Sequence, residues 1–197
     1  MGDPNKYTEM VLDGREYELI RAQHGLLSRW SIAQKVRGCS YLLFAASATV
    51  PIMVFLPPAV SQTYFGGNPA FSPVAFSALL LLSVACLLVS AGGLGVVSAY
   101  RSSLGEVSES QAWSLVGFED IFSGFGFVTG LLGVVATLVL AGLGHAGLGA
   151  IESLGASGVH PYHDEFFLSM TVLTAGGVAF CTGTNVFVVG TFLERLE

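Results

Sequence analysis

Residues 56–73 read LPPAVSQTYFGGNPAFSP, and they interrupt a run without Asp, Glu, Lys or Arg that extends from Gly38 to Tyr100. Clustered proline, glycine and asparagine end one helix and let the chain turn before the next begins. A helix needs roughly 20 apolar residues to cross about 30 Å of hydrocarbon. Because the run is long enough for two crossings, this stretch is predicted to connect two membrane helices.

Two further charge-free runs lie later in the chain, at 121–151 and 166–193. Of the 197 residues, 52% are hydrophobic and only 11% are charged, whereas about 25% are charged in a typical soluble domain. Backbone groups in lipid must be bonded within their own segment, and at these lengths this favours helices over barrel strands. We therefore predict an all-α membrane protein, with four transmembrane helices in an antiparallel bundle. The predicted spans, which make up a domain of residues 38–197, cover about 38–57, 74–100, 117–143 and 166–193.

The basic residues all fall on one side of these spans. Six of the eight Lys and Arg precede the first span, Arg101 follows the second and Arg195 follows the fourth. The connections near 58–73 and 144–165 contain neither residue type. Because Lys and Arg accumulate on the cytoplasmic side, this distribution predicts a multi-pass protein of the cell membrane with both termini in the cytoplasm.

Residues 1–37 form a separate polar segment before the first span. From about Glu16 onward, apolar side chains that include Leu19, Leu27 and Trp30 recur at helical spacing among basic residues. This pattern is typical of an amphipathic helix lying on the inner leaflet, with Trp30 at the headgroup level. Two alternatives stay open, a frayed tail and a hairpin that turns at Asp13-Gly14.

Small residues recur every seven positions in three of the predicted spans. The stripes are Ala78, Ala85, Gly92 and Ala99; Ser123, Gly130, Thr137 and Gly144; and Ser169, Gly176, Gly183 and Gly190, with Gly126 adding a closer pair with Gly130. A seven-residue repeat keeps one stripe facing a neighbouring helix, and small residues let two backbones approach in lipid. The neighbour could belong to the same chain, to a second copy or to another membrane subunit.

Two adjacent carboxylates, Glu119 and Asp120, lie in the stretch SLVGFEDIFSGFGF at residues 114–127. Ionisable residues within spans are functional candidates because burying a charge there is costly. At about one turn inside the third span, the two acids could instead be structural, since carboxylates complement the positive end of a helix dipole.

A candidate polar cluster follows from the expected heights of side chains in the bundle. Thr182 and Asn185 in the fourth span, and Arg101 after the second, are predicted to lie near the height of Glu119 and Asp120. In an oligomer, these acids would line the cytoplasmic mouth of a cation pathway. Arg101 would otherwise neutralise one of them.

A second constellation lies in VHPYHDEF, residues 159–166. Its metal-capable side chains are His160, His163, Asp164 and Glu165, with His145 predicted nearby at the outer end of the third span. Imidazole and carboxylate groups could hold zinc or another divalent ion. An H-x-x-H spacing beside acids is not specific, and the two acids also suit the first turn of a helix. We therefore expect no cofactor, and a divalent metal at these residues is the weaker alternative.

The sequence lacks four common enzyme motifs, the phosphate-binding loop, G-x-S-x-G, C-x-x-C and H-E-x-x-H. Three functions remain. The first is a homo-oligomeric ion channel or pore, and it leads because the acids give it a specific prediction. The second is a non-catalytic accessory or scaffolding subunit of a larger membrane complex. The third is a membrane enzyme or metal site at the outer histidines. The expected partners are the lipid bilayer and either a second copy or another membrane subunit, and no nucleic-acid surface is indicated.

Overall fold

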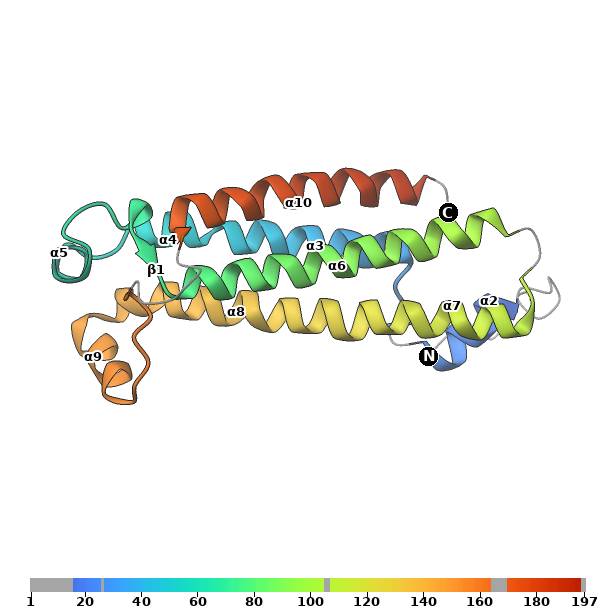
Figure 1. Cartoon of the computed structure of the whole chain (residues 1–197), viewed down its shortest axis with the longest axis horizontal. Coiled ribbons are helices and arrows are strands. Elements are labelled where there is room, and N and C mark those ends of the chain that lie inside the picture. The colour runs from blue at the N-terminus through green and yellow to red at the C-terminus, as the bar shows by residue number, and fades with distance from the viewer. Residues whose placement is uncertain (1–15, 26, 105–106, 164–169, 196–197) are drawn as a thin grey trace.

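Four helices in the computed structural model are long and apolar enough to cross a membrane, and the structure describes residues 16–25, 27–104, 107–163 and 170–195. The all-helical architecture with four candidate membrane spans, as predicted from the sequence, is confirmed at this level. The spans are α3 (Ile32–Ser47) with α4 (Thr49–Val54); α6 (Phe76–Ser103); α7 (Glu109–Ile121), the π-helical turn η2 (Phe122–Phe127), α8 (Val128–Gly142) and η3 (Leu143–Ala146); and α10 (Val172–Glu194). Consecutive spans run in opposite directions (Figure 1).

The first and third spans begin earlier than predicted from the sequence. At the start of α3, the Gln34 amide N–H donates to Ser31 Oγ at 3.2 Å, and the Ser31 N–H donates to Gln34 Oε1 at 3.0 Å. This reciprocal capping box satisfies two backbone donors and starts the helix at Ile32 instead of about residue 38. The third span starts at Glu109, where the Ser108 N–H donates to Gln111 Oε1 at 3.0 Å.

The lead helix is shorter than the amphipathic helix predicted from about Glu16 to Gln34. Helix α2 covers Glu16–His24 and ends before Leu27, whose φ of 56° lies in the left-handed region. A helix cannot continue through that conformation, because it is unfavourable for a residue with a side chain. Helix α2 packs against α7 at the end of the bundle where α10 also ends (Figure 1). The Asp13-Gly14 hairpin considered as an alternative lies outside the described residues.

The opposite end of the bundle carries the short connecting elements, and we call it the α9 end (Figure 1). The predicted connection at 56–73 contains α5 (Pro58–Tyr64) and the 3₁₀ turn η1 (Pro69–Phe71). Strand β1 (Pro73–Val74) pairs antiparallel with β2 (Met170–Thr171), and this pairing joins the starts of α6 and α10. Helix α9 (Leu148–Ala156) lies beyond the end of α8.

Glycine allows the closest contacts between the spans. A Cβ added at Gly176 would lie 2.3 Å from Val50 Cγ2, and one at Gly183 would lie 3.1 Å from Leu43 Cβ. The third-span stripe is buried along its length, and a Cβ at Gly130 would lie 2.6 Å from Leu87. The stripes on the third span and on α10 therefore pack within the chain, although Ser169 lies outside the described residues.

The stripe on α6 differs from the other two. Ala85, Gly92 and Ala99 are exposed, and nothing lies within 4 Å of a Cβ built at Gly92. Ala78, the first residue of the stripe, is half-buried, so the stripe is open from Ala85 onward within the described part of the chain.

The neighbouring glycines Gly176 and Gly177 provide a matched test of this packing. We expect Gly176→Ala to reduce the free energy of unfolding by about 1–3 kcal/mol, because the added methyl group must displace Val50. Gly177→Ala has open space around it and should be neutral, or stabilising by up to about 1 kcal/mol through helix propensity. Thermal unfolding in detergent measures both variants, and equal midpoints would contradict the close α3–α4 contact with α10.

Candidate functional site: a buried charge cluster beneath the lead helix

Glu119 is the most deeply buried carboxylate among the described residues, with 1% of its surface exposed. Its Oε1 accepts hydrogen bonds from Arg21 Nε at 2.9 Å and from Lys35 Nζ at 2.6 Å. Its Oε2 accepts a hydrogen bond from the Tyr17 hydroxyl at 2.6 Å. Three donors from α2 and α3 therefore converge on one carboxylate of α7.

A second layer of charges surrounds these contacts. Glu18 of α2 forms an ion pair with Arg101 at the end of α6, and the Arg101 guanidinium lies 4.4 Å from the centre of the Tyr17 ring. Arg21 also donates to the backbone carbonyl of Trp30, in the turn between α2 and α3. We call the residues Tyr17, Glu18, Arg21, Lys35, Arg101 and Glu119 the Glu119 cluster.

The charges of this cluster come close to balance. Arg21, Lys35 and Arg101 carry positive charge, while Glu18 and Glu119 carry negative charge, and the half-buried Asp120 lies near enough to act electrostatically on Lys35. Removing one partner of a buried pair leaves the other charge uncompensated, which is strongly unfavourable. The arrangement therefore fixes the position of α2 against α7 and the start of α3.

The two donors on α2 hold their protons tightly. Burial, together with the adjacent Glu119 carboxylate, raises the pKa of the Tyr17 phenol above its ordinary value. Burial opposes the charge on Arg21, but the Glu119 carboxylate outweighs it and raises the pKa of the guanidinium. Both groups therefore remain hydrogen-bond donors to Glu119 throughout the neutral pH range.

The structure places the other predicted cluster residues differently. Arg101 joins Glu119 through Tyr17 and Glu18, without a direct ion pair between the two. Asn185 is exposed on α10, and its side-chain amide donates to the Cys181 carbonyl of its own helix at 2.8 Å. Thr182 is half-buried, one residue before Gly183, which faces α3.

The helix-dipole explanation for the two acids does not fit the observed start of the third span. Because α7 begins at Glu109, the first-turn carboxylate is Glu109, and Glu119 lies about three turns farther along. Glu119 is instead compensated by Arg21 and Lys35, which are two of the six basic residues before the predicted first span.

The predicted metal-capable residues do not assemble within the described part of the chain. His145 Nε2 is 3.0 Å from the Ile52 carbonyl, and the imidazoles of His160 and His163 stack with their centres 5.2 Å apart. Asp164 and Glu165 lie outside the described residues. Among the described residues, no group of three or more His, Cys, Asp or Glu side chains could hold a metal ion.

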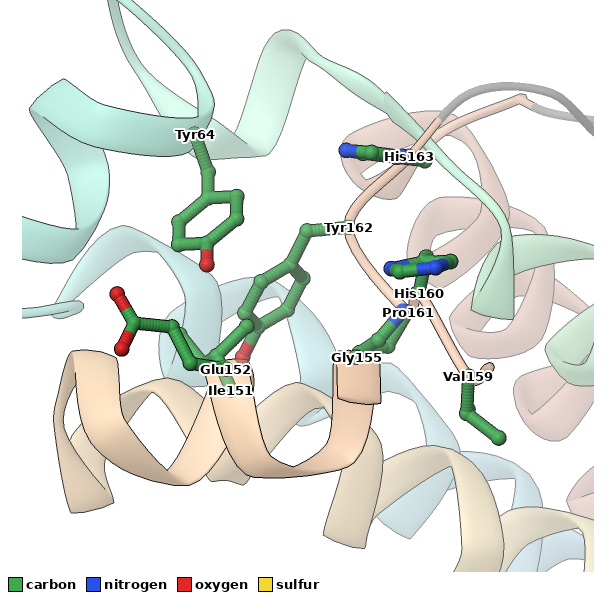
Figure 2. A pocket seen from close by; sticks show the side chains of 9 residues that line it. All are labelled: Tyr64, Ile151, Glu152, Gly155, Val159, His160, Pro161, Tyr162 and His163. Atoms are coloured by element: carbon green, nitrogen blue, oxygen red, sulfur yellow. The ribbon is translucent and has the colours of Figure 1, made fainter. Parts of the chain in front are cut away.

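The α9 end nevertheless contains a pocket of about 280 Å³ beside the histidine pair. Tyr64 of α5, Glu152 of α9 and the 159–163 turn contribute to its lining, as Figure 2 shows.

Comparisons of the chain with protein-family models, with curated proteins and with solved structures found no match.

Proposed function

We propose that this chain is a non-catalytic membrane subunit that associates with another membrane helix, from a partner subunit or a second copy, through the outer face of α6. The observation that carries the proposal is the stripe Ala85, Gly92 and Ala99, which is exposed while the stripes on the third span and α10 are packed within the chain. Lipid tails gain little from small residues, whereas a neighbouring helix gains close backbone contact.

A groove lies beside this stripe, on the same face of α6. It has a volume of about 620 Å³ and runs between the end of α6 and α7, next to Val96, Tyr100 and Phe118. Val96 and Phe118 are exposed large apolar side chains at its edge. A helix seated on the small residues of α6 would place its own side chains in this groove, as in other helix–helix contacts in lipid.

The charge cluster favours this function over a pore with an acidic mouth. A pore mouth requires a carboxylate that faces water and remains available to cations. Glu119 is buried and already bonded to Tyr17, Arg21 and Lys35. Its chemistry supports a structural role, in which it holds the lead helix to the bundle.

The orientation proposed for this subunit follows the basic residues. All of the Lys and Arg in the chain lie before the first span, in its first two turns, in the last turn of the second span or just after the fourth, and the positive-inside rule assigns these segments to the cytoplasm. The Glu119 cluster and α2 would then lie at the cytoplasmic surface, and the α9 end would lie outside.

The proposal predicts selective cross-linking from α6 in native membranes. With the three native cysteines replaced, Ala99→Cys on the stripe should cross-link to a neighbouring membrane protein, and Gly177→Cys, an open position on α10, should not. Adding Gly92→Leu should reduce the Ala99→Cys product about tenfold or more, because the larger side chain separates the backbones. Adding Gly117→Leu instead, at an open position of α7, is the matched control and should leave the yield unchanged.

The mass of the cross-linked product identifies the neighbour. A product of twice the chain mass indicates a second copy, and any other defined mass indicates a different subunit. Equal yields from positions 99 and 177, or no effect of Gly92→Leu, would overturn the proposed α6 interface.

A further inference from the structure

We propose that the pocket at the α9 end binds a small organic cation, an alkylammonium group held between Glu152, Tyr64 and Tyr162. This site lies at the end of the bundle opposite the Glu119 cluster (Figure 1) and is independent of the proposed α6 interface. Three features of the pocket support this ligand class: a rigid aromatic wall, a carboxylate that no described residue pairs with, and a surrounding sequence that lacks Lys and Arg.

The aromatic wall is held in place by Tyr162, which is 4% exposed. Its hydroxyl accepts the Gly144 backbone N–H at 2.8 Å and donates toward the carbonyls of Leu140 and Ala141, each at 3.2 Å. The ring of Tyr64 lies 5.8 Å from that of Tyr162, centre to centre, in an edge-on arrangement. These contacts fix the Tyr162 ring before any ligand arrives, so little ordering is needed on binding.

Glu152 supplies the negative charge. It is exposed in the pocket lining and has no hydrogen bond or ion pair with another described residue. Figure 2 shows its carboxylate and the Tyr64 hydroxyl on the same side of the Tyr162 ring, with His160 and His163 on the other side. A cation beside the Tyr64 and Tyr162 rings would therefore also be near this carboxylate.

The sequence around the pocket selects for positive charge. The two connections at this end, 58–73 and 144–165, contain three acids and no Lys or Arg. An aromatic surface attracts a cation through its ring quadrupole, and aromatic sites of this kind recognise quaternary ammonium groups. A volume of about 280 Å³ suits a small ligand and is near the lower end of typical ligand pockets.

Choline and its neutral isostere 3,3-dimethyl-1-butanol test this inference directly, because they share a shape and differ in charge. The full chain is purified in a maltoside detergent, since a phosphocholine detergent would carry the probe's own group, and binding is measured by isothermal titration calorimetry. We expect choline to bind at least about tenfold more tightly than the neutral alcohol, because both the carboxylate and the rings favour the charged form.

Variants of the pocket lining locate the site. Glu152→Gln should weaken choline binding about fivefold, as expected for loss of a partly exposed charge partner. Tyr64→Leu should weaken it similarly, whereas Tyr64→Phe keeps the ring and should retain most of the affinity. Glu109→Gln removes an exposed acid of α7 at the opposite end of the bundle and serves as the matched control, with no change expected.

Each contrary result would overturn the inference. Equal binding of choline and the neutral alcohol would indicate an apolar pocket without charge recognition, and an unchanged affinity in Glu152→Gln would exclude the proposed carboxylate. The absence of choline binding would overturn it as well. Stoichiometric zinc binding that is lost on His160→Ala with His163→Ala, without choline binding, would assign the pocket to a metal.

Discussion

Replacing Glu119 with glutamine is expected to destabilise the protein by about 3–5 kcal/mol, because it leaves Arg21 and Lys35 buried together without a negative charge between them. The amide oxygen can still accept hydrogen bonds, but it carries no negative charge to offset two cations. Thermal unfolding in detergent should show a much lower midpoint than for the unchanged chain. This is the largest effect expected of any single substitution in the cluster.

The lead helix should also come away from the bundle in this variant. Two of the three donors to Glu119 lie on α2, so losing the carboxylate removes most of the polar contact that holds the helix to α7. Arg29 is exposed in the turn after α2, and trypsin should cleave there faster once α2 is released. Cleavage at Arg29 therefore reports on α2 separately from unfolding of the spans.

Two further variants make this prediction specific. Glu109→Gln alters an exposed acid in the first turn of the same helix and should cost only about 0.3–1 kcal/mol through the helix dipole. Adding Lys35→Met to Glu119→Gln removes one of the two unpaired cations and should recover part of the lost stability. Equal midpoints for Glu109→Gln and Glu119→Gln would show that the cluster contributes no more than a surface charge.

The four spans could be predicted because lipid imposes a simple rule on composition. Each span contains a long charge-free run, and such runs are visible without knowledge of any tertiary contact. The starts of the first and third spans were missed because charged residues precede those runs inside the same helices. Local signals were present in both cases, since Ser31-x-x-Gln34 and Ser108-x-x-Gln111 are capping-box patterns.

Glu119 could be identified as a candidate, but its partners could not. Tyr17, Arg21 and Lys35 lie 102, 98 and 84 residues away from it in the chain, and no local pattern links them. The spacing of Tyr17 and Arg21 does place two side chains on one face of α2. That spacing indicates a buried face of the helix but does not identify what covers it.

Asn185 illustrates why height along a bundle is insufficient to predict a contact. Helical rise alone places it near the level of Glu119, but its direction depends on the rotation of α10. Gly183 faces Leu43 and Phe44 of α3, and two residues later the helix has turned by about 200°. Asn185 therefore points away from the bundle and bonds to its own backbone.

The second large effect is expected at Gly126, in the π-helical turn that follows α7. A Cβ added there would lie 2.7 Å from Ser90 Cβ and 3.2 Å from the Cys86 carbonyl oxygen of α6. A flexible side chain could move aside, but a backbone carbonyl moves only if α6 shifts. We expect Gly126→Val to destabilise the protein by about 3 kcal/mol, at the upper end of the usual cost of overpacking.

This close approach also supports a hydrogen bond between the same two helices. Ser90 Oγ of α6 donates to the Phe122 carbonyl at the start of the π-helical turn at 2.7 Å. Separating the helices at Gly126 should lengthen this bond, adding to the cost of the clash. Gly117→Val is the matched control, because Gly117 is exposed on α7 with nothing within 4 Å of an added Cβ. If the two valine variants unfold at the same temperature, close packing at Gly126 does not stabilise the bundle.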